Sequence, residues 1–482
     1  MQKRLFVVAI VTLLTLSTQA KVRLPHLIGD NMILQQNTEA RLWGWDKPGQ
    51  KVNVTVSWNQ QVYTTKADKA GRWLVKVPTP AASYQPLSIT FDDGDQTTIH
   101  NVLSGEVWVC AGQSNMEMPV RGFGNCPVEG YNDEVVNARE YRGIHYVKIP
   151  SVMSMTPLDD ANCEWCEIGP KTVGEASATG YFFAQVVNRA LDIPVGLIMA
   201  NKGGTRVESW LTRENLKKYT NEPLDTMEIV KGHDWDYHRQ LVWGNGTFNP
   251  ILNYTVKGIL FYQGCSNVGD PGNQYSDRLA LLVRQWRSQF GLGEIPFYFV
   301  EIAPFHYDNV DGDNGARLRE QQFLAAQRIP NSGLVCTNDL AYPYEATQIH
   351  PTQKRPVGQR LAYLALNKTY GMENVWCESP SYKDMKIVGD TIHIHLNNDY
   401  GSINRFEGIE GFEVAGPDRV VHPAKATHFW QPGGGYWDET IQIVCPEVKE
   451  PVALRYCFKN FQLGNLKNGA GLPLFPFRTD EW

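Results

Sequence analysis

The chain of 482 residues is too long for one hydrophobic core of ordinary size, which stops growing at about 250 to 300 residues, so we expect two or three domains. Hydrophobic residues make up 42% of it and charged residues 20%, without a low-complexity tract, which excludes a largely disordered protein. The formal net charge of -6 offers no basic surface to neutralise phosphates and argues against nucleic acid as a partner.

The first twenty residues have the pattern of a secretory signal. Lys3 and Arg4 precede an apolar stretch over 5–16, and small residues follow up to Ala20, where a peptidase would cut. The stretch is shorter than the ~20 residues of a membrane-crossing helix, and no later segment is apolar enough to span. We therefore expect residues 1–20 to be removed and the mature protein to be secreted, periplasmic or extracellular, without a membrane span.

Residues 21–104 predict a small β-sandwich. Short β-rich runs between turn residues lie at 40–45, 52–58, 61–65, 73–77 and 87–91. From Val107 the pattern changes to apolar strands that alternate with amphipathic helices, which indicates a parallel sheet covered on both faces. The change places a domain boundary near Ser104.

Residues 105–375 then predict an α/β domain of about five parallel strands. The strands are expected at 107–111, 195–200, 258–262, 297–302 and 333–337. Helices are expected at 275–290, 317–329 and 357–366, where apolar side chains recur at helical spacing and belong to the core. After about Trp376 alternation returns, as at 391–396 and 452–457, so residues 376–482 predict a C-terminal β-rich region.

Nine cysteines, an odd number, leave at least one thiol unpaired within the chain. Cys163 and Cys166 have the spacing of a metal or redox motif, but no second Cys or His pair stands nearby to complete a zinc site. We expect a local disulfide or two ordinary thiols there, and no metal.

Polar segments follow the predicted strands. In an open parallel sheet, ligands bind beyond the carboxyl ends of the strands, so the residues at these positions are the candidates for chemistry. After the first three strands and the last one come, in order, Gly112-Gln113-Ser114-Asn115-Met116, Asn201-Lys202-Gly203-Gly204-Thr205, Gln263-Gly264-Cys265-Ser266-Asn267 and Ile349-His350-Pro351.

These segments hold the parts of a serine esterase. A serine attacks a carbonyl well when a base removes its proton and donors wait for the oxyanion. Ser114 would attack, His350 would take the proton, and the N–H groups of Ser114 and Gly204 with the Gln263 side chain would bind the oxyanion. A serine after a strand is more commonly a turn residue, however, and Met116 stands where the Gly-x-Ser-x-Gly elbow has its second glycine.

Several ordered motifs resemble those of the sialate O-acetylesterases, which are SGNH hydrolases. The first is Gly105-Glu106-Val107-Trp108 with Ala111-Gly112-Gln113-Ser114-Asn115-Met116; others lie at 203–210, 257–264, 318–320, 349–351 and 476–480. The resemblance covers nearly the whole mature chain. It implies a three-layer αβα, flavodoxin-like catalytic domain with flanking β-sandwich regions, no cofactor, and a serine carboxylic-ester hydrolase that works through an acetyl-enzyme.

Two carboxylates of the family pattern are missing. Cys265 stands where the family has Glu, and Gln348 where it has Asp two residues before His350. A carboxylate beside a catalytic histidine holds its tautomer, and its loss costs ~10⁴ in turnover in serine proteases. Orientation by the main-chain carbonyl of Gln348 would give a Ser-His dyad, and Glu345 and Asp339 are alternative acids. A nucleophilic role for Cys265 needs a lowered pKa, so a buried small thiol is expected instead.

Substrate contacts are predicted from aromatic and basic residues. Sugar rings stack on aromatic faces, and an aromatic cluster precedes Asn245, an asparagine of the family pattern. The members of the cluster are Trp235, Tyr237 and Trp243. These side chains fit a core or a lid as well as they fit a sugar site. Arg121 or Arg206 would pair with the carboxylate of a sialic acid, or is a plain surface charge. The predicted oxyanion- or substrate-binding residues are therefore Gly204, Gln263, Asn245, Asn267 and Arg206.

Three functions fit these residues. The first is acetylester hydrolysis on sialic acid, the second the same chemistry on xylan or another hemicellulose, and the third carbohydrate binding on an esterase scaffold that lost its acids at 265 and 348. Dependence on an arginine separates the first two, and binding without turnover marks the third. A glycosidase lacks support because no pair of carboxylates follows the strands.

Overall fold

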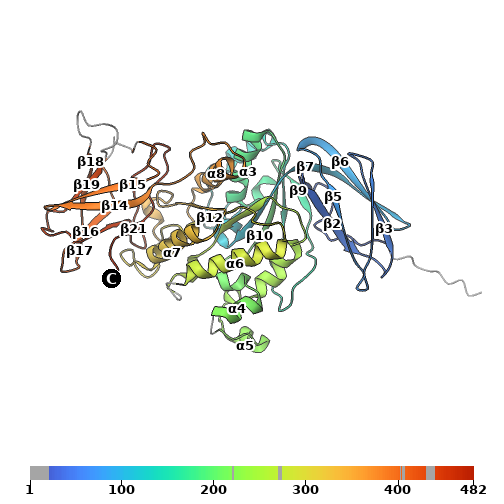
Figure 1. Ribbon diagram of the computed structural model, residues 1–482, viewed down its shortest axis with the longest axis horizontal. Coiled ribbons are helices and arrows are strands. Elements are labelled where there is room, and N and C mark those ends of the chain that lie inside the picture. The colour runs from blue at the N-terminus through green and yellow to red at the C-terminus, as the bar shows by residue number, and fades with distance from the viewer. Residues whose placement is uncertain (1–20, 220–221, 270–273, 402, 404–407, 430–439) are drawn as a thin grey trace, which may run out of the picture.

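The computed structural model describes residues 21–482 except 220–221, 270–273, 402, 404–407 and 430–439. The predicted signal at 1–20 lies outside these residues and stays a prediction. Three regions follow one another along the longest axis: an N-terminal β region, a central α/β region and a C-terminal β region (Figure 1). The two β regions therefore lie at opposite ends of the molecule.

The N-terminal strands form two facing sheets. One contains β2 (Glu39–Trp45) and β5 (Arg72–Pro78); the other contains β1 (Ile33–Gln35), β3 (Lys51–Val56), β4 (Val62–Lys66), β6 (Ser83–Asp92) and the first part of β7 (Gln96–Gly112). Every second residue of β3 is buried, as the period of two in a strand requires. Trp73 of one sheet packs on Phe91 of the other, with ring centroids 5.8 Å apart, so the core lies between the sheets.

Strand β7 runs from the N-terminal sheet into the central sheet. Its first half pairs with β6 and β1, and its second half pairs with β10 and β11. The predicted boundary near Ser104 therefore falls inside one continuous strand, and the two regions share a hydrophobic core that extends from Val54 to Phe261.

The central sheet has the predicted parallel arrangement. Its order is β13 (Ser332–Val335), β12 (Phe297–Val300), β11 (Gly258–Tyr262), β7, β10 (Val195–Asn201), β8 (Ile144–Lys148) and β9 (Trp165–Glu167). Strands β13 to β8 are parallel and β9 is antiparallel at the edge. The sequence analysis missed β8, which makes the sheet wider than the predicted five strands.

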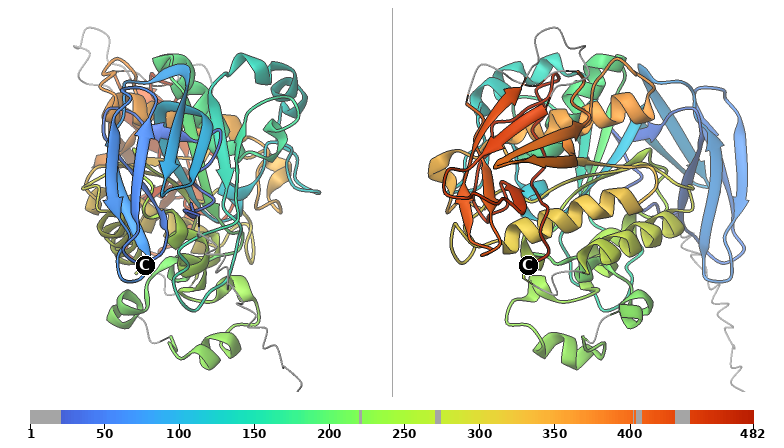
Figure 2. Two further views of the ribbon diagram at one scale, coloured as in Figure 1. Left: turned by 90° about the vertical axis from the view of Figure 1, so that its right-hand side faces the viewer. Right: turned by 60° about the vertical axis from the view of Figure 1, so that its left-hand side comes forward.

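Helices cover both faces of this sheet. α6 (Tyr275–Phe290) and α7 (Asn314–Arg328) lie on one face, and α3 (Ala178–Leu191) and α8 (Lys354–Leu364) on the other (Figure 1, Figure 2). Buried side chains of β10 alternate between the two resulting cores, with Leu197 facing α3 and Ile198 facing away from it. The three-layer αβα fold with flanking β regions is confirmed.

The C-terminal region has two sheets of its own. One is β14 (Ser381–Val388), β15 (Thr391–Asn397), β19 (Thr440–Val444) and β18 (Lys425–Phe429); the other is β17 (Val421–Pro423), β16 (Phe412–Ala415), β20 (Ala453–Tyr456) and β21 (Phe477–Arg478). They enclose a separate core that includes Ile443 and Tyr456. Arg319 of α7 joins this region to the α/β body, because its guanidinium donates to the carbonyl of Lys459 at 2.5 Å.

The shorter helices are α1 (Ser114–Glu117), α2 (Tyr131–Asn137), α4 (Arg213–Tyr219) and α5 (Thr226–Lys231). α4 and α5 belong to a long excursion between β10 and β11 that protrudes from the body (Figure 1, Figure 2). In the part of the chain that the structure describes, no helix is long and apolar enough to cross a membrane, and no group of side chains is suited to a metal ion. All nine cysteines are described and are free, so Cys163 and Cys166 are two thiols.

Candidate active site

The carboxyl ends of three neighbouring strands bring the predicted polar segments together. From β7 the chain builds one side of the sheet through β8 and β10, and then the other side through β11, β12 and β13. Such a reversal leaves the ligand crevice at the carboxyl end of the first strand. Ser114 follows β7 at this edge, Gly204 follows β10 and Gln263 follows β11.

Ser114 and His350 meet at this edge, where Nε2 of His350 lies 2.7 Å from Oγ of Ser114. The side-chain amide of Asn115 donates to the carbonyl of the residue before His350 at 3.0 Å and so ties the histidine loop to α1. Gly112 adopts φ +129°, and a Cβ there would lie 2.3 Å from the carbonyl oxygen of Tyr262. Only glycine therefore lets β7 and β11 converge just before the serine.

The surroundings of His350 keep its imidazole neutral. Burial, and after it the positive charge of Lys354, lowers the pKa of His350 to about 4. Lys354 is itself only 1% exposed, and its Nζ donates to the carbonyl of Pro351 at 2.5 Å. Burial lowers the pKa of Lys354 to about 7, against the opposing charge of Glu345. A neutral imidazole at pH 7 is able to take the proton of Ser114, as a general base must.

Among the residues that the structure describes, no carboxylate contacts the side of His350 away from Ser114. The Gln348 side-chain oxygen accepts from the main-chain N–H of His350 at 3.2 Å. The atom recorded beside Nδ1 is Sγ of Cys126, at 3.7 Å, and not the main-chain carbonyl of Gln348 that we expected. The same Sγ lies 3.1 Å from the Gln348 side-chain oxygen.

Neither alternative acid reaches the histidine. Glu345 accepts from the main-chain N–H of Tyr342 at 2.8 Å and of Thr352 at 3.0 Å, and so caps its own turn. Asp339 forms a bidentate ion pair with Arg360 at 2.7 and 2.8 Å. Both carboxylates are therefore engaged in holding the loops between β13 and α8.

The backbone N–H groups of Ser114 and Gly204 are the two candidate oxyanion donors. The N–H of Gly203 donates to the Glu117 carboxylate at 2.6 Å, and a Cβ on Gly203 would lie 3.3 Å from Cβ of Ser114, so this loop packs on the serine. The described structure records no acceptor for the N–H of Ser114 or of Gly204. Gly204 has φ +77°, and a Cβ there would come within 2.5 Å of the Tyr237 ring.

The predicted oxyanion contact of Gln263 is wrong. Its amide nitrogen donates to the Thr205 carbonyl at 3.0 Å and to the Asn267 side-chain oxygen at 2.8 Å, which uses both of its hydrogens. Its oxygen accepts from the Tyr275 hydroxyl at 2.8 Å. Asn267 donates in turn to Glu208 at 3.0 Å. Both residues are fully buried, because the turn after β11 points them into the core, where they brace the loops around the site.

Arg206 and Asn245 also have partners within the protein. The Arg206 guanidinium is 5% exposed and binds the Glu222 carboxylate through two contacts of 2.7 Å. Asn245 is half-buried and its amide donates to the Ser154 carbonyl at 3.2 Å. Arg121, the other candidate for an acidic sugar, contacts the Glu175 carboxylate at 2.7 Å.

The aromatic cluster divides into a stacked pair, of which Trp235 is exposed and Tyr237 half-buried, and a core residue. Trp235 is 60% exposed and stacks on Tyr237, with ring centroids 5.7 Å apart and planes at 13°. Tyr237 in turn lies against Gly204. Trp243 is buried. We define the Trp235–Tyr237 pair as the aromatic platform.

Cysteine reactivity does not compete with Ser114. Burial raises the pKa of Cys265 to about 11, so its thiol is protonated at neutral pH.

Among the neighbours of His350, Cys126 and Lys354 were missed by the sequence analysis. Lys354 follows the histidine by four residues at the start of α8, so its position in the sequence is a signal, whereas Cys126 lies far upstream and outside every motif.

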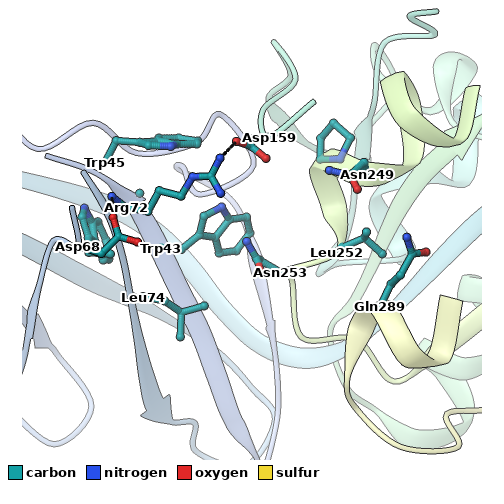
Figure 3. A pocket seen from close by; sticks show the side chains of 13 residues that line it. Trp43, Trp45, Asp68, Arg72, Leu74, Asp159, Asn249, Leu252, Asn253 and Gln289 are labelled. Atoms are coloured by element: carbon teal, nitrogen blue, oxygen red, sulfur yellow. Dashed lines mark hydrogen bonds and ion pairs between the residues drawn. The ribbon is translucent and has the colours of Figure 1, made fainter. Parts of the chain in front are cut away.

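A cavity of about 590 Å³ lies elsewhere, between the N-terminal sandwich and the α/β body (Figure 3). Its walls include Trp43 and Trp45 on one side and the segment 249–253 on the other, and the ion pair of Arg72 with Asp159, 2.7 Å long, crosses it. Because 249–253 precedes β11, this cavity is at the amino ends of the parallel strands, the edge opposite Ser114.

Comparison with known proteins identifies the family of the chain. The family model described as carbohydrate esterase, sialic acid-specific acetylesterase, matches residues 104–367. The sialate O-acetylesterase of Homo sapiens is 26% identical over 404 residues, covering 76% of this chain and 74% of that protein. That of Mus musculus is 24% identical over 454 residues and covers 82% of each chain.

Among solved structures, a carbohydrate acetylesterase from Xanthomonas citri matches with a TM-score of 0.83 at 29% identity, covering 96% of this chain and 100% of that one. The match extends beyond the α/β body to both β regions. The family resemblance of the motifs is confirmed. The chain belongs to the carbohydrate esterase family of the sialic acid-specific acetylesterases.

Proposed function

We propose that the protein hydrolyses O-acetyl esters of carbohydrates through an acetyl-enzyme on Ser114. The 2.7 Å contact between Ser114 Oγ and His350 Nε2 is the observation that carries this proposal. The neutral state of His350 and the two unused N–H groups beside the serine support it, because nucleophile, base and oxyanion donors then stand at one edge of the sheet.

In this mechanism His350 Nε2 takes the Ser114 hydroxyl proton while Oγ bonds to the acetyl carbonyl carbon. The carbonyl oxygen becomes an oxyanion and accepts from the N–H groups of Ser114 and Gly204. Its collapse breaks the bond to the sugar oxygen, which takes the proton from the imidazolium and leaves. Water then gives a proton to His350 and attacks the acetyl-enzyme, acetate departs, and the proton returns to Ser114 Oγ.

The dyad is tested by acetate release from 4-nitrophenyl acetate and from acetylated sugars. Ser114→Ala and His350→Ala are expected to lower kcat by about 10⁴-fold or more, since each removes a group that takes part in bond formation. Ser288→Ala and His100→Ala, on exposed residues of the same types, serve as controls. Full turnover by Ser114→Ala contradicts the proposal, and a folded wild type without turnover favours the carbohydrate-binding hypothesis.

A neutral sugar is the substrate class that the arginines favour. Arg206 and Arg121, the two candidates for a sialic acid carboxylate, each already hold a carboxylate of this chain. An incoming carboxylate would have to displace Glu222 from the buried Arg206, whereas at Arg121, which is 55% exposed and contacts Glu175 through Nε alone, it would compete with a surface ion pair. We therefore place acetylated hemicellulose before sialic acid. The same assay decides between them: a higher kcat/KM on acetylated xylan than on O-acetylated sialic acid is expected, and the reverse order restores the sialate function.

A further inference from the structure

We infer that the sulfur of Cys126 accepts a hydrogen bond from the Nδ1–H group of His350 and so does the positioning that a carboxylate does in a Ser-His-Asp triad. Cys126 is thereby a positioning residue, since it acts on substrate only through the histidine. The inference rests on the proposed function, because it assigns the third member of the same catalytic arrangement. The sulfur lies 3.7 Å from Nδ1, on the far side of the ring from Ser114.

The protonation state of His350 requires a partner for Nδ1. Nε2 must be unprotonated to accept from the Ser114 hydroxyl at 2.7 Å, and the neutral ring then carries its proton on Nδ1. Among the residues that the structure describes, Cys126 Sγ is the recorded contact of Nδ1. Sulfur is a weak acceptor with a long contact distance, so 3.7 Å is within its reach.

The thiol has a separate use for its own hydrogen. Its Sγ lies 3.1 Å from the side-chain oxygen of Gln348 and 3.3 Å from that of Asn125. If S–H donates to Gln348, the sulfur lone pairs remain free to face His350. The contacts then run in one direction, from imidazole N–H to sulfur and from S–H to the amide oxygen. This arrangement gives a role to Gln348, which acts on the thiol and not on Nδ1.

The loop around Cys126 fixes the sulfur in place. Cys126 is 1% exposed, and its main chain pairs with Phe123 through hydrogen bonds of 2.9 and 3.1 Å. The Phe123 ring packs edge-on against the imidazole, with centroids 5.2 Å apart and planes at 70°. One tight turn therefore holds both the sulfur and an aromatic wall against His350.

A neutral thiol orients the histidine without adding charge. Burial raises the pKa of Cys126, so the group stays a thiol at neutral pH. It selects the tautomer but gives little stabilisation to the imidazolium that forms in the transition state. We therefore expect its removal to cost about ten-fold in kcat, the scale of one modest hydrogen bond, and much less than the ~10⁴ of a triad carboxylate.

The test compares three substitutions by kcat and KM on 4-nitrophenyl acetate and by ¹⁵N NMR of the His350 ring. Cys126→Ala and Cys126→Val remove the acceptor, the first with a small loss of side-chain volume and the second with a small gain. Cys126→Ser keeps a group that both accepts and donates. Cys377→Ala, at a buried thiol with no recorded contact to His350, is the control.

In the wild type we expect the His350 ring to be protonated on Nδ1. In Cys126→Ala and Cys126→Val we expect a mixture of tautomers, with kcat about ten-fold lower and KM unchanged. Cys126→Ser is expected to retain most of kcat and the Nδ1-protonated tautomer. Equal kcat in all three variants and wild type, or an unchanged tautomer in Cys126→Ala, overturns the inference. Equal losses of kcat in Cys126→Ser and Cys126→Ala would mean that Cys126 acts only through packing, which also overturns the inference. Failure of the proposed function is separate, because it is read from Ser114→Ala, and the tautomer is measured without turnover.

Discussion

At the scale of single residues, two basic groups share one buried corner. Burial disfavours the charged form of both His350 and Lys354, and the positive charge of Lys354 further disfavours the imidazolium of His350. Since the pKa of Lys354 is about 7 and that of His350 about 4, the lysine is charged throughout the range in which the histidine titrates. The catalytic base is therefore held in its unprotonated state well into acid.

This pairing predicts the acid limb of the pH profile. Because kcat/KM reports the free enzyme, it is expected to fall only as pH drops through about 4, and not through 6.5, the ordinary value for histidine. Lys354→Met removes a positive charge that opposes the imidazolium, so the pKa of His350 rises and the acid limb moves to higher pH. Lys449→Met, at an exposed lysine, is the control. An acid limb near 6.5 in wild type, or one unmoved by Lys354→Met, contradicts the argument.

Residue identity at the strand ends was predictable from the sequence, but contacts across loops were not. Ser114, Gly204 and His350 follow parallel strands, and the rule for ligand sites in such sheets places them together. Gln263 follows a strand as well, yet its side chain turns inward to Thr205. Spacing along the chain does not say which way a side chain points. For the same reason nothing in the sequence joined Cys126 to His350.

At the scale of elements, the excursion between β10 and β11 carries the aromatic platform. Arg206 anchors it, because the guanidinium binds Glu222 of the excursion and the carbonyl of His238 at 3.0 Å. Burial raises the pKa of Glu222, but hydrogen bonds from His233 and Arg206 outweigh it and lower this pKa to about 2. The anchor therefore stays ionised wherever His350 is active.

The platform predicts a dependence on substrate size. Trp235→Ala is expected to raise KM for an acetylated oligosaccharide by about five- to ten-fold, since covering roughly 50 Å² of ring at 25 cal/mol/Å² gives about 1 kcal/mol. Turnover of 4-nitrophenyl acetate stays unchanged, because no sugar is present to stack. Trp376→Ala is a close control: that tryptophan is 48% exposed and stacks on Tyr400 at 4.8 Å. Equal effects of both changes on the oligosaccharide would argue against the platform.

Elements with strong periodicity were the most predictable. The helix expected at 275–290 is α6, because its apolar side chains recur on one face, and the strand expected at 258–262 is β11. Strand β8 was missed since its short segment mixes apolar and polar residues around His145, whose imidazole bonds to the carbonyl of Asn31. A pattern of hydrophobic residues does not reveal a histidine that is buried because it has a hydrogen-bond partner far away in the sequence.

At the scale of the whole molecule, the two β regions are joined to the catalytic body in different ways. The N-terminal sandwich shares strand β7 and a continuous hydrophobic core with the central sheet. The C-terminal sheets enclose their own core and meet the body through polar contacts such as Arg478 with Glu320, at 3.0 Å, and through Phe475, whose ring packs on Phe323 of α7 with centroids 5.2 Å apart. The sandwich is therefore part of the unit that positions Ser114, whereas the C-terminal region is attached to it.

This difference predicts which core mutations inactivate the enzyme on heating. Ile89 in the sandwich and Ile443 in the C-terminal region are both fully buried, and replacing either by alanine costs about 2 to 5 kcal/mol locally. Ile89→Ala is expected to lower the temperature at which esterase activity is lost, because β7 unfolds with the sandwich and Ser114 follows directly after β7. Ile443→Ala is expected to lower a separate calorimetric transition while activity persists to the wild-type temperature. If both variants lose activity together, the three regions unfold as one cooperative unit, and the contacts of the C-terminal region with the body couple the two as tightly as β7 couples the sandwich.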